Sequence, residues 1–215
     1  GGFGSGGGLY LKETTANLTN VTMSENQSDN GGGIYSEGSA MTILNSILWD
    51  NYPDQIFVGG ALESTLDITF TDLGSYEHDD ITSDGNLYYI SNDFISEDPQ
   101  FENQEIGNFY LEWGSDCIDS GDPNSLLDSD GTITEMGAYR YIHVQGCMDD
   151  EASNYNEDAT LDNTCDYDYE TYYVDDDGDE QDISDNDSSH PVNSIATAIG
   201  WASDGDTILV SDGIY

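Results

Sequence analysis

Two segments of this chain repeat in one register, and this repeat limits the possible folds more than any other feature. Residues 6–10 read GGGLY and residues 31–35 read GGGIY, a spacing of 25 residues. The same offset aligns five further pairs: Leu18 with Ile43, Asn20 with Asn45, Met23 with Leu48, Glu25 with Asp50, and Asn26 with Asn51. Self-similarity at a fixed period of this size is the signature of an array of stacked units.

Each unit contains short runs in which apolar and polar residues alternate, such as residues 17–23 (NLTNVTM). Alternation over five to seven residues, interrupted by Gly, Asn and Ser, predicts strands rather than helices. A unit of 25 residues cannot bury its own apolar face, but units stacked on one another can. The sequence therefore predicts an all-β chain that begins with a parallel solenoid.

This pattern resembles the right-handed parallel β-helix of the pectate-lyase-like superfamily. The resemblance implies a right-handed solenoid whose like residues lie above one another. Asn20 and Asn45 are then placed for an Asn ladder, in which stacked side-chain amides satisfy one another at a bend. The alternative is that both are ordinary turn residues.

A further series of short motifs is similar to the closing coils of many secreted bacterial β-helix proteins. In order they are EDPQF (97–101), FYL (109–111), SDCIDSGDP (115–123), DSDGT (128–132) and MGAY (136–139). We therefore expect residues 1–142 to hold the C-terminal coils and closing region of a β-helix. Cys117 falls in this region as an inert core thiol, or alternatively as the partner of a cysteine outside this sequence.

Residues 146–167 (GCMDDEASNYNEDATLDNTCDY) resemble a short G-C-x-D-x-x-A-x-N-Y-N module that recurs in large secreted bacterial surface proteins. We expect residues 143–170 to be an acidic linker bracketed by a disulfide between Cys147 and Cys165. Closing a loop of this length stabilises a chain by roughly 3 kcal/mol. A segment this small has too little core to fold without a staple or a metal.

The linker and its surroundings also carry oxygen ligands of the kind that Ca²⁺ prefers. Three candidate Ca²⁺ sets are Asp149, Asn154, Asn156, Asp158 and Asp162; Asp128, Asp130 and Glu135; and Asp175, Asp177 and Asp179. The last set is not an EF-hand, because Glu180 stands where that loop requires Gly. The alternative for the first set is a solvated acidic loop that the disulfide alone holds together.

The last segment, 171–215, reads as the beginning of another domain. A short strand at 172–174 precedes a helix within 190–202, a turn at 204–206 and a strand at 207–210. The expected apolar face of the helix contains Ile195, Ala198, Ile199 and Ala202. This order resembles the N-terminal capping helix and first coil of a second β-helix. We therefore expect the sequence to be a window on a longer tandem array.

Charge excludes several function classes. The chain has 45 Asp and Glu against two basic residues, Lys12 and Arg140, and a formal charge of −43. Such a surface repels nucleic acid and anionic membranes, and no stretch approaches the roughly 20 apolar residues of a membrane span. Of the acidic residues, 17 fall within residues 146–187. We therefore expect no nucleic-acid partner and no membrane insertion.

Enzymatic chemistry of the superfamily is also unexpected. A uronate lyase needs a basic residue, and neither Lys12 nor Arg140 is placed on a strand face with an evident partner. A hydrolase needs two suitably spaced carboxylates. Asp67 and Asp72 come nearest to such a pair, but they are more simply solvent-facing strand and turn residues. The sequence therefore predicts that the chain is not an enzyme.

The expected function is that of a structural or adhesive repeat module in a giant extracellular protein, as a stiff stalk, filament or surface adhesin. Its cofactor would be Ca²⁺, and its partners neighbouring copies or modules, in tandem or side by side, with cell-surface glycans as further partners. The expected location is outside the cell, at its surface or on an appendage. The alternative is a carbohydrate-binding or polysaccharide-degrading β-helix.

Overall fold

The computed structural model describes residues 4–74, 79–178 and 191–214. The chain divides after His143 into two compact units, Gly1–His143 and Val144–Tyr215. This division falls one residue beyond the expected end of the first domain, and the second unit contains both the cysteine-bracketed segment and the last segment. Within the described residues, no helix is long and apolar enough to cross a membrane.

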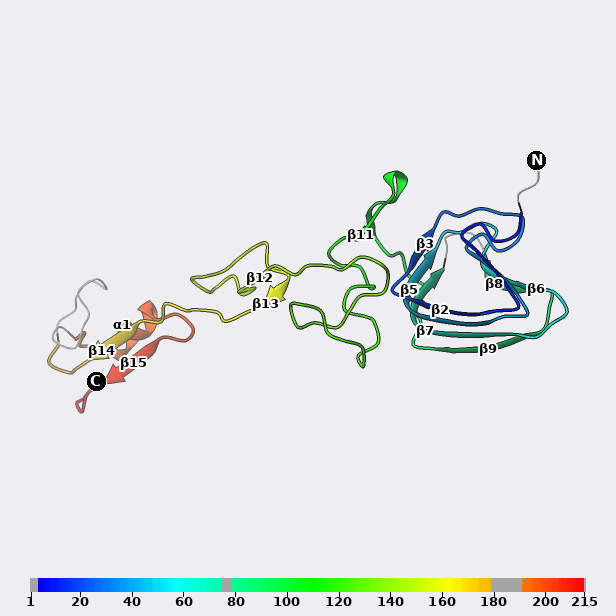
Figure 1. Ribbon diagram of the computed structural model, residues 1–215. Coiled ribbons are helices and arrows are strands. Elements are labelled where there is room, and N and C mark those ends of the chain that lie inside the picture. Colours follow the sequence, from blue (N-terminus) through cyan, green and yellow to red (C-terminus); the bar gives the residue numbers. More distant parts are fainter. Residues whose placement is uncertain (1–3, 75–78, 179–190, 215) are drawn as a thin grey trace. The chain divides into compact units, whose positions relative to one another are not determined.

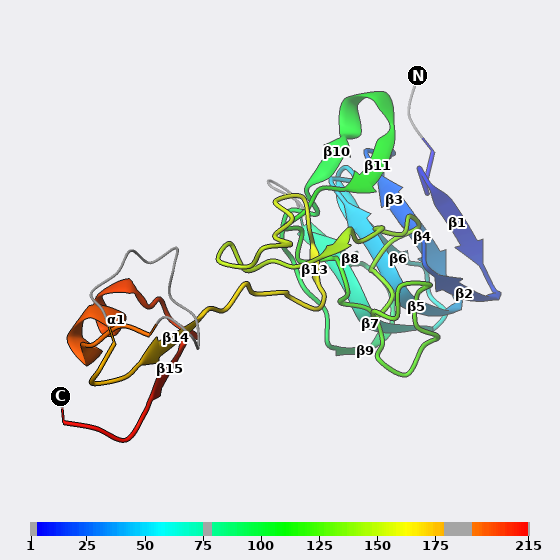
Figure 2. The same cartoon turned by 90° about the vertical axis from the view of Figure 1, so that its left-hand side faces the viewer.

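The first unit is built from parallel strands that return to the same faces on each turn. Its first turn holds β1 (Leu9–Lys12), β2 (Thr15–Thr19) and β3 (Thr22–Ser24), and its second β4 (Ile34–Glu37) and β5 (Ala40–Trp49). Its third turn holds β6 (Asp54–Gly59) and β7 (Ser64–Gly74), followed by β8 (Asp79–Ser83) and β9 (Leu87–Asn92). One sheet has the order β1-β4-β6-β8 and the other β2-β5-β7-β9, with β3 beside β5 (Figures 1 and 2). The prediction of a parallel β-solenoid is confirmed, with about three turns.

Strand register follows the sequence repeat. In the pairing of β2 with β5, Leu18 lies beside Ile43, as the 25-residue offset predicts. The pairing of β4 with β6 places Ile34 beside Ile56, an offset of 22. β5 and β7 keep the offset of 25, so the shortening lies in the connection that leads into β6. The connection that leads into β4 contains the GGG motif, which has no copy before β6.

Successive bends of the solenoid also lie 25 residues apart. Asn20, Asn45 and Phe70 have φ angles of 53°, 48° and 45°. This left-handed conformation is costly for most residues and least so for Gly and Asn. The predicted bend at Asn20 and Asn45 is therefore present.

The Asn ladder lies at a different corner from the one expected. No hydrogen bond joins Asn20 to Asn45 in the described part of the chain; instead, Asn26 Nδ2 donates to Asn51 Oδ1 at 2.9 Å. Asn51 Nδ2 in turn donates to Gln55 Oε1 at 2.6 Å, and Asn51 is fully buried. Both Asn pairs have the same 25-residue offset, but the buried Asn45 finds its partners in the closing segment: its Oδ1 accepts the Asp122 N–H and its Nδ2 donates to Ser125 Oγ.

The interior of the solenoid is filled by aliphatic side chains in vertical rows. Its buried members are Leu11, Ile34, Met41, Ile43, Leu48, Ile56, Val58, Leu66, Ile68 and Leu73. Each strand contributes alternate residues, because successive side chains point to opposite faces. Stacked turns thus bury the apolar face that no single turn could bury.

Residues 99–143 close the unit by covering one flank of the solenoid. They include β10 (Phe101–Asn103), a 3₁₀ turn at Gln104–Ile106 and β11 (Asn108–Leu111), which is antiparallel to β10. Ile47 and Trp49, on β5, point outward into a second cluster with Leu111, Cys117 and Met136. The expected closing coils therefore appear as a lateral cover, and the second half of β5 is buried on both faces.

The second unit contains two small parallel pairs and the one described helix. β12 (Gln145–Gly146) pairs with β13 (Leu161–Asp162), and β14 (Thr171–Val174) pairs with β15 (Thr207–Val210). The helix α1 (Ile195–Trp201) begins where Ser194 Oγ accepts the backbone N–H of Thr197 at 3.3 Å.

Helix α1 packs on the β14–β15 pair through a cluster that includes Tyr172, Val174, Val192 and Ala198. The expected helix face is wrong at Ile199, which is 61% exposed. Helix α1 has only about two turns. It buries Ala198, while the adjacent residue Ile199 faces solvent. Ile195 and Ala202, both expected on this face, pack against the cluster together with Trp201 and Ile208.

Candidate functional site

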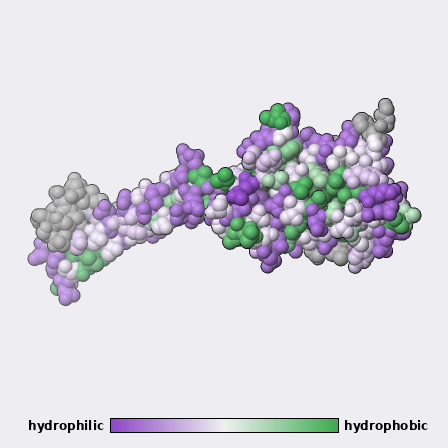
Figure 3. Space-filling model, viewed as in Figure 1, coloured by the Kyte–Doolittle hydropathy of each residue, from purple (hydrophilic) through white to green (hydrophobic). Residues whose placement is uncertain are grey.

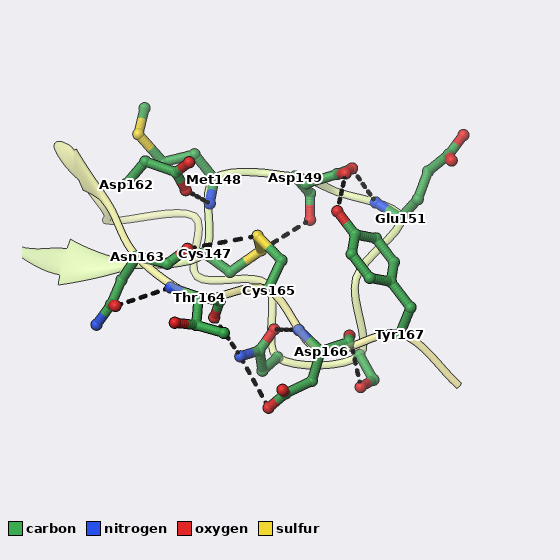
Figure 4. The surroundings of a disulfide bond; sticks show 12 residues. Cys147, Met148, Asp149, Glu151, Asp162, Asn163, Thr164, Cys165, Asp166 and Tyr167 are labelled. Carbon is green, nitrogen blue, oxygen red and sulfur yellow. Dashed lines mark hydrogen bonds between the residues drawn. A yellow bond between two sulfur atoms is a disulfide. The ribbon is translucent and has the colours of Figure 1, made fainter. Parts of the chain in front are cut away.

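The cysteine-bracketed loop of the second unit is closed as the sequence predicts. Cys147 and Cys165 form a disulfide with a Cα–Cα distance of 5.0 Å (Figure 4). The side chain of Asn154 completes the staple: its Nδ2 donates to the Thr164 carbonyl at 3.0 Å, and its Oδ1 accepts the Asp166 N–H at 2.8 Å. The loop is therefore held by one covalent bond, by the short β12–β13 pair and by side-chain hydrogen bonds.

Most of the Ca²⁺ ligands expected in this loop serve as acceptors for backbone N–H groups. Asp162 Oδ1 accepts the Met148 N–H at 3.2 Å, Asn156 Oδ1 that of Asp158 at 3.1 Å, and Asp149 Oδ1 that of Glu151 at 3.0 Å. Asp149, Asp158 and Asp162 do not form a group of mutually close oxygen atoms. Figure 3 shows the described surface of this unit as mainly hydrophilic.

Asp149 has a second partner that the sequence did not suggest. The Tyr167 hydroxyl donates to Asp149 Oδ2 (Figure 4). This hydrogen bond lowers the pKa of Asp149 and raises that of Tyr167 to about 12. Since Tyr167 also stacks on Tyr169, with ring centroids 5.2 Å apart, the bond fixes the chain as it leaves the disulfide.

Three consecutive carboxylates follow strand β14. Asp175, Asp176 and Asp177 each offer an oxygen within 4.8 Å of the others, the only group of this kind among the described residues. Asp175 and Asp177 were predicted as ligands and Asp176 was not, while Asp179 lies outside the described residues. A proton shared with Asp175 raises the pKa of Asp177 and lowers that of Asp175.

The third predicted set is split in the structure. Asp130 Oδ1 accepts the Thr132 hydroxyl at 2.8 Å, and the Asp130 carboxylate also accepts the His143 backbone N–H. Glu135 is 2% exposed, and Asp128 and Glu135 line the same cavity of about 170 Å³. Burial, followed by hydrogen bonding to Asp128, raises the pKa of Glu135 to about 8.

Asp67 and Asp72, the pair considered above for polysaccharide hydrolysis, cannot both contact a polysaccharide, because one of them is buried. Asp72 is fully buried, which corrects the expectation that it faces solvent. Its Oδ2 accepts the Cys117 thiol at 3.3 Å, and its Oδ1 the Glu97 N–H at 3.3 Å. Burial raises the pKa of Asp72 to about 7 and also raises that of Cys117, so the thiol is a buried, protonated core group.

Both basic residues are paired. Lys12 Nζ lies 3.0 Å from Glu37 Oε1, and Arg140 Nε lies 3.5 Å from Asp128 Oδ2. Lys12 was expected to have no evident partner. The signal was present in the sequence, because the two residues of the Lys12–Glu37 pair are 25 positions apart and therefore adjacent in the stack.

Sequence reasoning missed an aromatic cluster in residues 110–143. Tyr110 and Tyr139 have ring centroids 4.7 Å apart, and Trp113 lies 5.9 Å from Tyr141. Trp113 is 55% exposed. The motifs quoted for this region contain two of these residues, but nothing in their spacing indicated that the rings would meet.

A second aromatic group runs along one face of the solenoid. Tyr10, Tyr35 and Phe57 stack with centroid distances of 5.1 and 5.5 Å and interplanar angles of 4° and 15°. Because each ring covers the face of the next, this stack offers ring edges rather than ring faces to solvent. It therefore stabilises neighbouring turns in the same way as the Asn26–Asn51 ladder.

Fold and geometry together define a parallel β-solenoid with a flank cover, followed by a disulfide-closed acidic unit. Searches against protein-family models, curated proteins and solved structures found no match for this chain.

Proposed function

We propose that this chain is a structural repeat module of a long extracellular protein, in which stacked turns act as a stiff spacer. The main observation behind this proposal is that alike or complementary side chains lie above one another along the solenoid. The Asn26–Asn51 amides, the Tyr10–Tyr35 rings and the Lys12–Glu37 ion pair all connect one turn to the next. Such ladders resist shear between turns, and the turns add about 4.8 Å of length each.

The finer fold assignment belongs to the same proposal. We take the solenoid to be right-handed and of the pectate-lyase-like type, because parallel crossovers within one sheet are right-handed in about 98% of cases. We take β14, α1 and β15 to be the cap and first coil of a second β-helix. Two observations support this: β14 and β15 pair in parallel, and α1 packs its buried Ala198 into one cluster with Val174 of β14.

An extracellular location and Ca²⁺ complete the proposal. The Cys147–Cys165 disulfide supports an oxidising compartment, where such bonds persist. The close oxygen atoms of Asp175, Asp176 and Asp177 support binding of Ca²⁺ in the acidic second unit. The partners would be neighbouring modules of the same protein, in tandem or side by side, in a stalk, filament or adhesin.

Imaging of the native protein tests this proposal. Antibodies raised against the purified chain are applied to intact cells of the source organism, and the labelled material is examined by electron microscopy. We expect label at regular intervals along rod-like structures outside the cell, and a change in rod stiffness when a Ca²⁺ chelator is added. Label confined to the cell interior, or on isolated globular particles, contradicts the structural role.

One observation favours a second function, carbohydrate binding. Trp113, Tyr110 and Tyr139 are each exposed, and sugar rings can stack on exposed aromatic rings. Binding of the whole chain to a glycan array is the test, with Trp113→Ala as the variant and Tyr88→Ala, 59% exposed on β9, as its control. Loss of binding in the first variant alone supports this function, and absence of any binding by the unmodified chain removes it.

A further inference from the structure

The cavity between the closing segment and the solenoid is lined by two neighbouring carboxylates, those of Asp128 and Glu135. It has a volume of about 170 Å³ and is lined by Asn20, Asp128, Thr134, Glu135, Tyr139 and Arg140, among others. Glu135 is 98% buried, and neither Glu135 Oε1 nor Asp128 Oδ2 has a hydrogen-bond partner. Buried carboxylate oxygens without a partner are costly, since burying an unpaired charge costs several kcal/mol.

Arg140 compensates this charge only in part. Its Nε is 3.5 Å from Asp128 Oδ2, while its Nη1 donates to Ser129 Oγ at 3.2 Å. The Arg140 side chain is 53% exposed, so water screens its charge, and no hydrogen bond from it reaches Glu135 among the described contacts. When both carboxylates are ionised, they carry one more negative charge than Arg140 supplies in positive charge.

The local backbone holds both carboxylates in place. Asp128 and Thr132 close a tight turn in which the Asp128 N–H donates to the Thr132 carbonyl at 2.9 Å. Glu135 precedes Met136, whose N–H donates to the Cys117 carbonyl at 3.0 Å within the covered flank. The carboxylate oxygens are thus presented by fixed backbone rather than by a loose acidic loop.

We propose that Asp128 and Glu135 bind a divalent cation of the oxygen-preferring class in this cavity, between the closing segment and the bend at Asn20. Carboxylate, hydroxyl and amide oxygens are the ligands that Ca²⁺ and Mg²⁺ prefer, and the cavity has room for an ion with retained water. Asp130, whose carboxylate accepts hydrogen bonds from Thr132 and from the His143 backbone, is not one of the ligands. This site is independent of the acidic second unit, so its failure would leave the proposed structural role standing.

The test is a titration of the whole chain with CaCl₂ and, separately, MgCl₂ in physiological salt, followed by NMR of the backbone amides. We expect saturable shifts confined to residues 128–140 with a dissociation constant of about 1 mM or below. The ion whose titration gives the lower dissociation constant is the one that the site prefers. Absence of saturable shifts in this segment with both ions shows that the pair holds only a proton, and overturns the proposal.

Three variants sharpen the result. Glu135→Gln and Asp128→Asn each remove a ligand charge but keep the shape of the side chain, and each should weaken binding at this segment by about tenfold or more. Arg140→Gln removes a competing positive charge and should tighten binding. Glu112→Gln, an exposed acid of the same closing segment, is the control for net charge. Equal weakening in the Glu112 and Glu135 variants would reduce the effect to non-specific attraction and overturn the site.

Discussion

Asn26 donates its side-chain amide to Asn51 Oδ1 at 2.9 Å, and the Asn26 backbone N–H donates to the same oxygen at 3.0 Å. Asn51 Nδ2 in turn donates to Gln55 Oε1 and to the Met23 carbonyl. One fully buried side chain therefore connects two turns of the solenoid through a chain of hydrogen bonds.

Asn51→Ala should destabilise the first unit by about 2–4 kcal/mol, because it leaves several buried donors and acceptors without partners at once. The measurement is urea unfolding followed by a probe of the first unit, such as Trp fluorescence. Asn20→Gly is the matched control, since Gly tolerates the left-handed φ of 53° and only a 3.4 Å bond to Thr134 is lost. Equal losses in both variants would contradict the ladder's position at Asn51.

The 25-residue offset of the repeat predicts which residues become neighbours in adjacent turns. It does not predict whether their side chains point into the solenoid or away from it. Leu18 and Ile43 pair as expected, and the same rule pairs Lys12 with Glu37. At a bend the alternation of inward and outward side chains is interrupted by a residue with positive φ. The offset therefore could not decide between Asn20 and Asn26 as the start of the ladder.

Contacts between the solenoid and the closing segment, residues 99–143, follow no period in the sequence. The Asp122 N–H donates to Asn45 Oδ1 at 2.8 Å across 77 residues, and no pattern in the sequence relates these two positions. Asp72 is an instructive case, because its neighbour in the stack is Ile47. An apolar residue at the aligned position was a sign that Asp72 would be covered rather than exposed.

Reducing the disulfide should destabilise the second unit selectively. Cys147–Cys165 spans 18 positions, and opening a loop of this size costs about 3 kcal/mol. Cys117 is already a free thiol, so a reductant breaks this one disulfide among the three cysteines. Hydrogen exchange should speed up at residues 145–166 and stay unchanged in β5 and β7. Faster exchange in the solenoid strands would mean that the two units do not unfold independently.

Gly137→Ala should weaken the attachment of the cover. Gly137 has a φ of 106°, and an added Cβ would lie 2.8 Å from Ile47 Cδ1 and 3.0 Å from Thr22 Oγ1. Backbone strain and crowding together should cost about 2–4 kcal/mol in urea unfolding.

Gly131→Ala separates the two causes of that loss. Gly131 has a φ of 92°, but nothing lies within 4 Å of its added Cβ. This variant therefore measures strain alone and should cost about 1 kcal/mol. If both variants lose the same stability, the close packing of Gly137 on Ile47 contributes nothing and the cover is held elsewhere.

Asp72 should make the first unit more stable in mild acid than at neutral pH. Burial raises its pKa from 3.8 to about 7, so between these values the folded protein retains a proton that the unfolded chain releases. The stability contributed by this group therefore falls as pH rises from about 4 to about 7, by at most about 4 kcal/mol. Below that window both states are protonated, and above it both are ionised.

Asp72→Asn removes the titrating group while keeping an oxygen for the Glu97 N–H. Urea unfolding from pH 4 to pH 8 should give a shallower fall in stability for this variant, which should exceed the unmodified chain in stability at pH 8. Asp116→Asn, exposed beside Cys117, controls for the loss of one negative charge from an acidic protein. A slope that is unchanged in Asp72→Asn, or equally reduced in both variants, would show that general charge repulsion rather than the buried carboxyl governs the response to pH.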